Sequence, residues 1–171
     1  GSLDMKELKF QILFFYYDRP RMAKNFALKS VLESSYTNWE LDFIDDGTDQ
    51  DGDKVIEDFF EENTSYLNPV DLFGENPDFR NKIKIRKTGN VRERGHSVFG
   101  RYANEGINES DADITLMLCD DDALLQDYLM NLRNFYIENP DVIYSYSHLV
   151  EYDPSKIERL EDIRYTKVSE K

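Results

Sequence analysis

The stretch Phe10-Gln-Ile-Leu-Phe-Phe-Tyr-Tyr17 is a nearly continuous apolar and aromatic run that ends at Asp18-Arg19-Pro20. A run of this length bounded by turn-forming residues predicts a strand buried on both faces, as in a parallel sheet. Pro20 suits the first turn of a helix, where a missing N–H loses no intrahelical bond. A helix over about residues 21–35 is therefore predicted next, with one apolar stripe at intervals of three and four. The residues of this stripe are Ala23, Phe26, Ala27 and Val31.

The alternation of strand and helix continues along the chain. Strands are predicted at residues 39–44, 83–86, 114–119 and 142–147, and helices at residues 54–62, 96–107 and 124–136. Residues 114–119 have the pattern of an interior strand, and residues 63–81 are expected to be irregular. The last helix is expected to turn four side chains inward: Tyr128, Leu129, Leu132 and Phe135.

This alternation predicts an α/β fold, a mostly parallel sheet with helices on both faces joined by right-handed crossovers. The length of 171 residues favours a single domain, placed at residues 10–152. Residues 1–9 are interpreted as a lead-in whose Gly1-Ser2 resembles the remnant of a cleaved tag, and residues 153–171 as a charged tail.

The composition excludes several classes of protein. The chain has 21 Lys and Arg against 35 Asp and Glu, a net charge of −14, which argues against a dedicated nucleic-acid binder. Aromatic residues make up 13%, which disfavours intrinsic disorder. Cys119 is the single cysteine, so a disulfide framework is excluded. No apolar run approaches the ~18 residues of a membrane span, and no signal peptide opens the chain.

Two acidic clusters follow predicted strands. Asp45-Asp46-Gly47 comes after the strand at residues 39–44, and Asp120-Asp121-Asp122 after the strand at residues 114–119. Ligands of open α/β sheets bind outside the carboxyl ends of the strands, so both clusters are expected at the binding edge. Like charges held close together are unfavourable, and a cation is therefore expected between or near the clusters.

Asp120-Asp121-Asp122 is interpreted as a site for Mn²⁺ or Mg²⁺, because hard carboxylate oxygens suit these ions. Helix capping accounts for one or two of the three carboxylates, and three in succession favour the metal. The candidate ligands are Asp121 and Asp122, and which pair of the three holds the ion is left open. Asp45-Asp46-Gly47 alone also fits an ordinary turn.

The remaining candidate groups are weaker. Arg92 and Arg94 are positioned to neutralise a diphosphate, although each taken singly also fits a solvated loop. Asp18 fits a helix cap, and His96 fits the start of a helix. The glycine-rich dinucleotide fingerprint, the phosphate-binding P-loop and the serine nucleophile turn are absent from the sequence. One cysteine and two distant histidines do not make a zinc site.

Four segments resemble, in order along the chain, the motifs of family 2 glycosyltransferases, inverting enzymes of the GT-A fold that use nucleotide-sugars. SVLESSY (residues 30–36) resembles S-V-L-x-Q-x-Y, and WELDFIDDGT (residues 39–48) resembles W-E-L-I-V-V-D-D-G-S. ANEGI (residues 103–107) resembles R-N-x-G-I, and LCDDD (residues 118–122) resembles L-D-x-D-D. Each piece alone is ordinary, but the ordered set, over about residues 10–152, is fairly specific.

The resemblance implies roles for individual residues. Asp46, together with Asp45, would accept a hydrogen bond from the nucleotide base, usually uracil, in a pocket lined by the residues after the first strand. Asp121 matches the carboxylate that holds Mn²⁺ or Mg²⁺ on the diphosphate. The implied donor-binding residues are Tyr17, Asp18, Asp45, Asp46, Arg94, which would lie near the base or diphosphate, and Asp120, which matches the position that touches the ribose.

The resemblance also implies the reaction. An acceptor hydroxyl of a glycan, glycolipid or glycoprotein attacks the anomeric carbon of a UDP-sugar with inversion, a carboxylate takes its proton, and the metal offsets charge on the leaving nucleoside diphosphate. We expect a cytoplasmic enzyme, with peripheral membrane association left open and no nucleic-acid partner.

Two departures from the family pattern stand out. Cys119 aligns with the first carboxylate of the family's Asp-x-Asp, so the register rests on Asp120 and Asp121, with Asp120 and Asp122 as the alternative. The segment that carries the family's catalytic base and acceptor site has no counterpart after Tyr152. Glu158, Glu161 and Asp162 match no family motif, and the base is left unassigned.

Several interpretations therefore stay open. The chain is a truncated enzyme, a donor-binding portion, or an enzyme completed by another segment or protomer. A non-catalytic nucleotide-binding module of the same fold is the alternative function. A phosphorylated receiver domain is disfavoured, because residues 148–152, which follow the last predicted strand, contain no lysine. A nucleotidyltransferase is also compatible with the acids, but its glycine-rich basic signature is absent.

Overall fold

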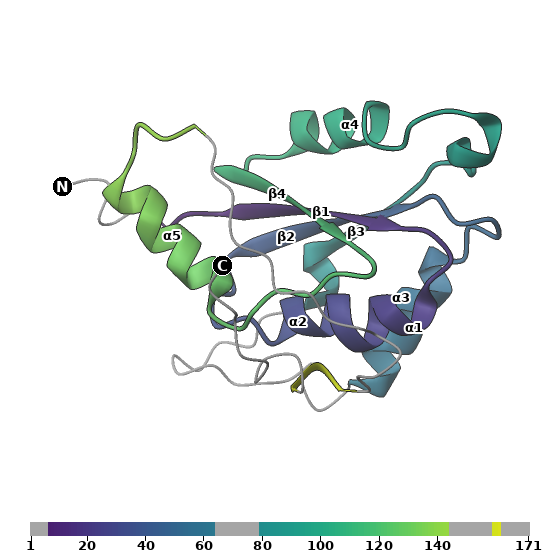
Figure 1. Cartoon of the computed structure of the whole chain (residues 1–171), viewed down its shortest axis with the longest axis horizontal. Coiled ribbons are helices and arrows are strands. Elements are labelled where there is room, and N and C mark those ends of the chain that lie inside the picture. Colours follow the sequence, from purple (N-terminus) through teal and green to yellow (C-terminus); the bar gives the residue numbers. More distant parts are fainter. Residues whose placement is uncertain (1–6, 64–78, 144–158, 162–171) are drawn as a thin grey trace, which may run out of the picture.

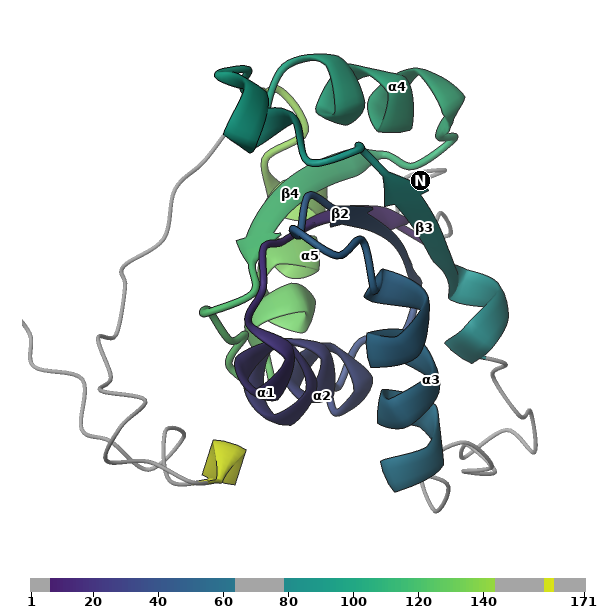
Figure 2. The ribbon, with the colours of Figure 1, turned by 90° about the vertical axis from the view of Figure 1, so that its right-hand side faces the viewer.

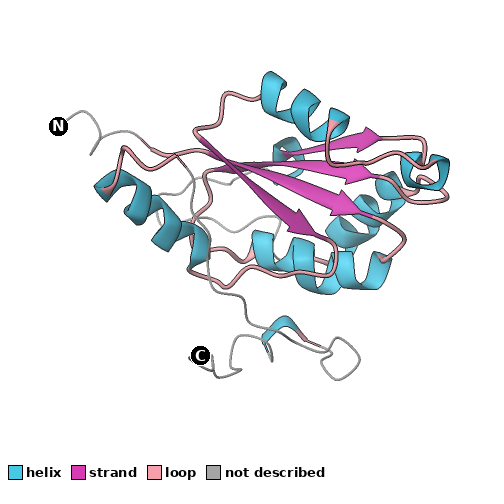
Figure 3. Cartoon of the chain, turned by 45° about the horizontal axis from the view of Figure 1, so that its top comes forward, coloured by secondary structure: helices cyan, strands magenta, loops and turns pink. Residues whose placement is uncertain are grey.

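The computed structural model describes residues 7–63, 79–143 and 159–161. Its centre is a four-stranded sheet in the order β3-β2-β1-β4, and every pair of neighbouring strands is parallel. The strands are β1 (Phe10–Tyr16), β2 (Trp39–Asp45), β3 (Ile83–Lys87) and β4 (Ile114–Cys119). Figure 3 shows the four arrows running in the same direction, so their carboxyl ends share one edge.

β1 is the strand that organises the sheet. It pairs with β2 on one side and with β4 on the other, and all seven of its residues are buried. Burial on both faces is what the apolar run predicts, and the prediction is confirmed. Its alternate side chains enter two different cores: Phe10, Ile12, Phe14 and Tyr16 enter one, and Leu13 and Phe15 the other.

The larger core lies between the sheet and the helices on one face. The first helical stretch is α1 (Pro20–Met22), a π-helical segment η1 (Ala23–Leu28) and α2 (Lys29–Leu32). α3 (Gly52–Glu62) lies beside it, and α5 (Tyr128–Glu138) contributes Leu129 to the same core. Figure 2 shows these helices on the face opposite α4 (Arg101–Glu109).

The smaller core lies on the other face of the sheet. Figure 1 shows that α4 covers this face. Six buried side chains from the sheet, η4 (Val91–Arg94), α4 and the loop between these two helical elements form this core. They are Leu13, Phe15, Ile44, Val91, Val98 and Ala103. The sheet therefore carries helices on both faces, and the predicted α/β fold class is confirmed.

The prediction that residues 114–119 form an interior strand is wrong for the described part of the chain. There β4 pairs with β1 alone and lies at an edge, and Met117 is 59% exposed. A short apolar run cannot distinguish a central strand from an edge strand with one buried face. The predicted strand at residues 142–147 falls mostly outside the described residues, and its two described members are not in a strand.

Two helices begin later than predicted. The helix expected from His96 starts at Arg101, because residues 91–94 form a 3-10 turn, η4 (Val91–Arg94), that ends at Gly95 with φ +77°. The helix expected from Leu124 starts at Tyr128, because the preceding loop is held by α2: the Leu124 N–H donates to Ser30 Oγ at 2.9 Å. Phe135, expected inward, is 40% exposed.

The predicted domain limits and the tail at residues 153–171 fall largely outside the described residues. Of the tail, Leu160 is described and packs with Phe26 of η1. Within the described residues, no helix has the length and apolar character that crossing a bilayer requires.

Candidate functional site

The end of β1 holds both acidic clusters, one on each side. The Asp46 N–H donates to the carbonyl oxygen of Tyr16 at 3.0 Å, and the Tyr17 N–H donates to Asp120 Oδ2 at 2.7 Å. Consecutive residues of one strand end therefore anchor the loop after β2 and the loop after β4. The clusters lie at the same edge of the sheet, as the strand pattern predicts.

Asp45 supports the loop after β2 with both of its carboxylate oxygens. Oδ1 accepts a hydrogen bond from the Gly47 N–H at 3.0 Å, and Oδ2 accepts one from the Gly52 N–H at 2.6 Å. Burial raises the pKa of this carboxyl, and the two backbone donors oppose that rise. Asp45 thus fixes the start of α3, which is a structural task that turn chemistry alone does not reveal.

Gly52→Ala is expected to destabilise the fold by about 2–3 kcal/mol, because an overpacked core site has no room for the added methyl. A Cβ on Gly52 lies 2.6 Å from Asp45 Oδ2 and 3.0 Å from the Phe43 ring. Urea unfolding measures the change. Gly100→Ala is the matched control, because its Cβ meets no atom within 4 Å. Equal stability of Gly52→Ala and the parent would contradict the packing of Asp45 against α3.

Asp46 differs from Asp45 because one of its oxygens accepts no hydrogen bond from the described residues. Asp46 is 1% exposed. Its Oδ1 accepts from the Val91 N–H at 2.7 Å and from the Thr88 hydroxyl. Its Oδ2 is buried, and no described group forms a hydrogen bond with it. An unsatisfied buried carboxylate oxygen costs free energy, which a hydrogen bond from a donor group would recover.

Tyr17 and Asp18 continue from β1 over this carboxylate. Asp18 accepts the Thr48 N–H at 2.9 Å and also bonds the Thr48 hydroxyl, which ties the loop after β1 to the loop after β2. The Tyr17 hydroxyl donates to Glu93 Oε1 at 2.5 Å. Tyr16, by contrast, is 1% exposed in the larger core and does not face the site.

The turn η4 brings arginines to the same place. The Arg92 guanidinium carbon lies 4.1 Å from the centroid of the Tyr17 ring, and Arg92 Nε lies 3.8 Å from Asp46 Oδ2. Arg94, the arginine carried over from the family resemblance, instead donates to the Thr88 carbonyl oxygen at 3.4 Å. Of the two, Arg92 lies against both Tyr17 and Asp46.

A cation from another loop, Arg19 after β1, lies against the acidic turn after β4. Asp120 is 3% exposed, and burial raises its pKa although the Tyr17 N–H and Arg19 both favour its charged form. Arg19 Nη1 lies 3.3 Å from Asp120 Oδ1 and 3.0 Å from Asp121 Oδ2. Arg19 therefore offsets part of the repulsion between neighbouring carboxylates.

Two of the three acids form a cluster suited to a metal ion. One ligand atom each from Cys119, Asp121 and Asp122 lie within 4.8 Å of one another. Asp120 lies outside this cluster, because its Oδ2 accepts the Tyr17 N–H; Arg19 lies against both Asp120 and Asp121. Burial, and then the charges of Asp122, Asp121 and Asp120, raise the pKa of the Cys119 thiol to about 11. At neutral pH the negative charge of the cluster is thus carried by carboxylates.

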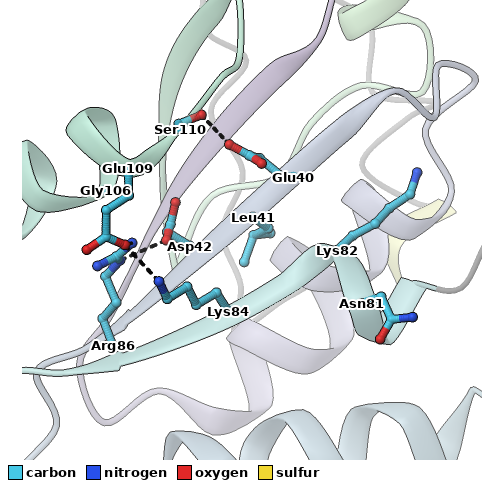
Figure 4. Close-up of a pocket in the computed structure, with 10 residues that line it drawn as sticks. All are labelled: Glu40, Leu41, Asp42, Asn81, Lys82, Lys84, Arg86, Gly106, Glu109 and Ser110. Atoms are coloured by element: carbon cyan, nitrogen blue, oxygen red, sulfur yellow. Dashed lines mark hydrogen bonds and ion pairs between the residues drawn. The ribbon is translucent and has the colours of Figure 1, made fainter.

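A separate cavity of about 200 Å³ lies between β2, β3 and α4 (Figure 4). Its charges bond to one another. Arg86 bonds Asp42 at 2.8 Å and Glu109 at 2.6 Å, and Lys84 bonds Glu109 at 2.7 Å. Gln11 completes the network by donating to Asp42 at 2.7 Å and to the Gly106 carbonyl at 2.8 Å. These mutual pairs fasten α4 to the sheet and give the cavity a structural role.

Four side chains lie at the site although the sequence does not predict their positions. Arg19 stands out in the sequence only as part of a capping turn, Arg92 only as one of two loop arginines, and Thr88 and Glu93 not at all. Their sequence signals are weak, because each acts through a partner on another strand end. Arg19 after β1 meets acids after β4, for example, and only the sheet order brings those ends together.

No protein-family model matches the sequence, and no curated protein matches it at a significant level. Among solved structures, residues 1–349 of S. aureus TarS match with a TM-score of 0.54 and 19% identity over 77% of this chain and 33% of that chain. The complex of TarS 1–349 with UDP matches with a TM-score of 0.50 and 18% identity over 77% of this chain and 32% of that one. The chain spans about a third of the length of TarS 1–349. The likeness shows that this chain shares the Rossmann-like α/β fold of TarS.

Proposed function

We propose that this chain binds the nucleotide of a UDP-sugar at the carboxyl edge of its sheet, as the donor-binding domain of an inverting, metal-dependent family 2 glycosyltransferase. The fold supports a nucleotide-sugar glycosyltransferase in general, and TarS, a protein of similar fold, has been crystallised with UDP. The nucleotide and the metal are proposed from the residues at the carboxyl edge of the sheet, and the family from the four sequence motifs.

The observation that carries the proposal is the buried Oδ2 of Asp46, which accepts no hydrogen bond from the described residues. The opposite oxygen is held by Val91 and Thr88, so the orientation of the carboxylate is fixed before any ligand arrives. Uracil offers one ring N–H flanked by two carbonyls, which suits a single fixed acceptor. A buried acceptor of this kind discriminates strongly, because a base without a matching donor leaves it unpaired.

Asp120 supports the same assignment on the ribose side. Its Oδ2 accepts the Tyr17 N–H, and the neighbouring residue Tyr16 accepts the Asp46 N–H. The end of β1 therefore positions both the carboxylate proposed for the base and the one proposed for the ribose. Nucleotide recognition at such an edge is the general pattern of open α/β sheets. The base then lies toward Asp46 and the ribose toward Asp120.

The acidic turn fits a hard divalent cation. Asp121 and Asp122 offer carboxylate oxygens, which Mn²⁺ and Mg²⁺ prefer. A bound ion would hold the diphosphate and neutralise charge on the leaving group. Arg19 lies against Asp121 and would add a positive charge beside the diphosphate.

Calorimetric titration of UDP in the presence and absence of Mn²⁺ tests the proposal. We expect binding in the micromolar to millimolar range typical of enzyme substrates, about 1 μM to 1 mM, and stronger binding with Mn²⁺. GDP and dTDP are titrated in parallel. Thymine offers the same ring N–H as uracil, so Asp46 does not separate these two bases, and UDP is the expected ligand by the family resemblance. Failure of all three nucleotides to bind would sink the proposal, and the acidic clusters would then be caps and turns.

The catalytic base stays unassigned. Of the three C-terminal acids considered, Glu161 is described, and its Oε1 lies 3.8 Å from Lys29 Nζ on α2. A nucleotide-binding module without transferase activity is therefore the second candidate. Release of UDP from UDP-sugars, measured with and without acceptor, distinguishes the two, because a pure binding module leaves the donor intact.

A further inference from the structure

We infer that the Arg92 guanidinium takes the place of the nucleotide base whenever no nucleotide is bound, and that it competes with the base for this place. This inference rests on the proposed function, since it concerns how the same site is filled. Arg92 makes two contacts that a bound pyrimidine would make. Its planar guanidinium lies over the Tyr17 ring, with 4.1 Å between guanidinium carbon and ring centroid, and its Nε faces Asp46 Oδ2.

The burial of Asp46 Oδ2 is the reason to treat Arg92 as a competitor. This oxygen is inaccessible to solvent, and yet no described group bonds it. Arg92 Nε lies 3.8 Å away, which is close enough to shield the oxygen but too far for a hydrogen bond. A base can therefore reach Oδ2 only after the guanidinium leaves.

The side chain of Arg92 is free to leave, whereas its backbone is not. The Val91 N–H is bonded to Asp46 Oδ1, and the Val91 side chain is buried in the smaller core, so η4 stays anchored to β2. Arg92 itself is 49% exposed, with solvent on one side. Opening the site thus requires a change of side-chain rotamer and no movement of the loop.

The Tyr17 ring is held in position by a second contact, independent of Arg92. Its hydroxyl donates to Glu93 Oε1, the residue next to Arg92, so the ring keeps its position when the guanidinium departs. A stacked guanidinium on a half-exposed ring contributes only a modest free energy, which a base with both a ring face and an N–H can exceed.

The test compares UDP affinity in the full chain and in Arg92→Ala, with Mn²⁺ present. Because the apparent affinity is reduced by the fraction of closed molecules, Arg92→Ala should bind UDP about three- to tenfold more tightly. Arg92→Lys keeps the charge but loses the planar stack and should lie between the two. Arg101→Ala removes the same charge from an exposed position on α4 and should leave the affinity unchanged.

A second probe separates the base from the phosphates. Inorganic pyrophosphate with Mn²⁺ lacks a base, so Arg92→Ala should not bind it more tightly than the parent does. Unchanged or weaker UDP binding by Arg92→Ala, with the parent binding UDP, would overturn the inference and leave the proposed function standing. A gain for pyrophosphate as large as for UDP would overturn it too. Loss of UDP binding in every variant and the parent would instead contradict the proposed function.

Discussion

Asparagine in place of Asp46 is expected to weaken UDP binding about 10- to 100-fold, which is the range for losing a hydrogen bond to a buried charged acceptor. The substitution acts on one oxygen. The asparagine side chain would keep an Oδ1 that accepts from Val91 and Thr88, while the atom at the Oδ2 position becomes an NH₂ group. An NH₂ group facing the ring N–H of uracil leaves two donors opposed.

The control for this variant is Asp49→Asn, which removes the same charge from an exposed position in the loop after β2. Asp49→Asn should bind UDP with the same affinity as the parent, because it removes only a solvent-exposed charge. Urea unfolding accompanies both variants, since a large loss of stability in Asp46→Asn would indicate a disturbed loop. Parent-like UDP affinity in a stable Asp46→Asn would show that Asp46 does not read the base.

The pair Asp46 and Arg92 also allows a double-mutant cycle. If Arg92 competes for Asp46, its removal should help less in the Asp46→Asn background, because the closed arrangement is already weakened. An equal gain in both backgrounds would mean that Arg92 acts through Tyr17 alone.

Much of the fold is predictable because its signals are local. The apolar run at β1, the stripe of η1 and α2, and the 3–4 spacing of α3 each reflect burial of a contiguous segment. The failures concern places where a distant contact decides. Val98 is buried by Phe15 without a helix, and Leu124 is held by Ser30 before α5 begins. An apolar residue in the sequence does not show which partner will bury it.

The sequence predicts which residues follow the strand ends of the site, but it does not predict their side-chain contacts. Asp46 and Asp120 could be placed at one edge, because parallel strands end together. The difference between Asp45 and Asp46 could not be predicted, since it depends on which oxygens the Gly52, Val91 and Thr88 donors reach. The positions of Arg19 and Arg92 likewise follow from side-chain contacts between strands that are far apart in sequence.

Removal of the metal is expected to weaken UDP binding about 10- to 100-fold, in the usual range for coupling between two ligands. Asp121→Asn should bind UDP in Mn²⁺ about as weakly as the parent does in EDTA, because one charged ligand of the ion is lost. Asp127→Asn is the matched control. It removes one carboxylate at the start of α5, where the side chain makes no capping bond.

UDP binding that does not depend on the metal would point to Arg19. It already lies 3.0 Å from Asp121 and supplies one positive charge at the turn. If the parent binds UDP equally well in Mn²⁺ and in EDTA, then Arg19 rather than a metal ion neutralises the diphosphate, and Arg19→Met should weaken binding more than Asp121→Asn does. If Mn²⁺ is required, the ion must draw Asp121 away from Arg19, and Arg19→Met should bind Mn²⁺ at least as tightly as the parent, because a competing cation has been removed.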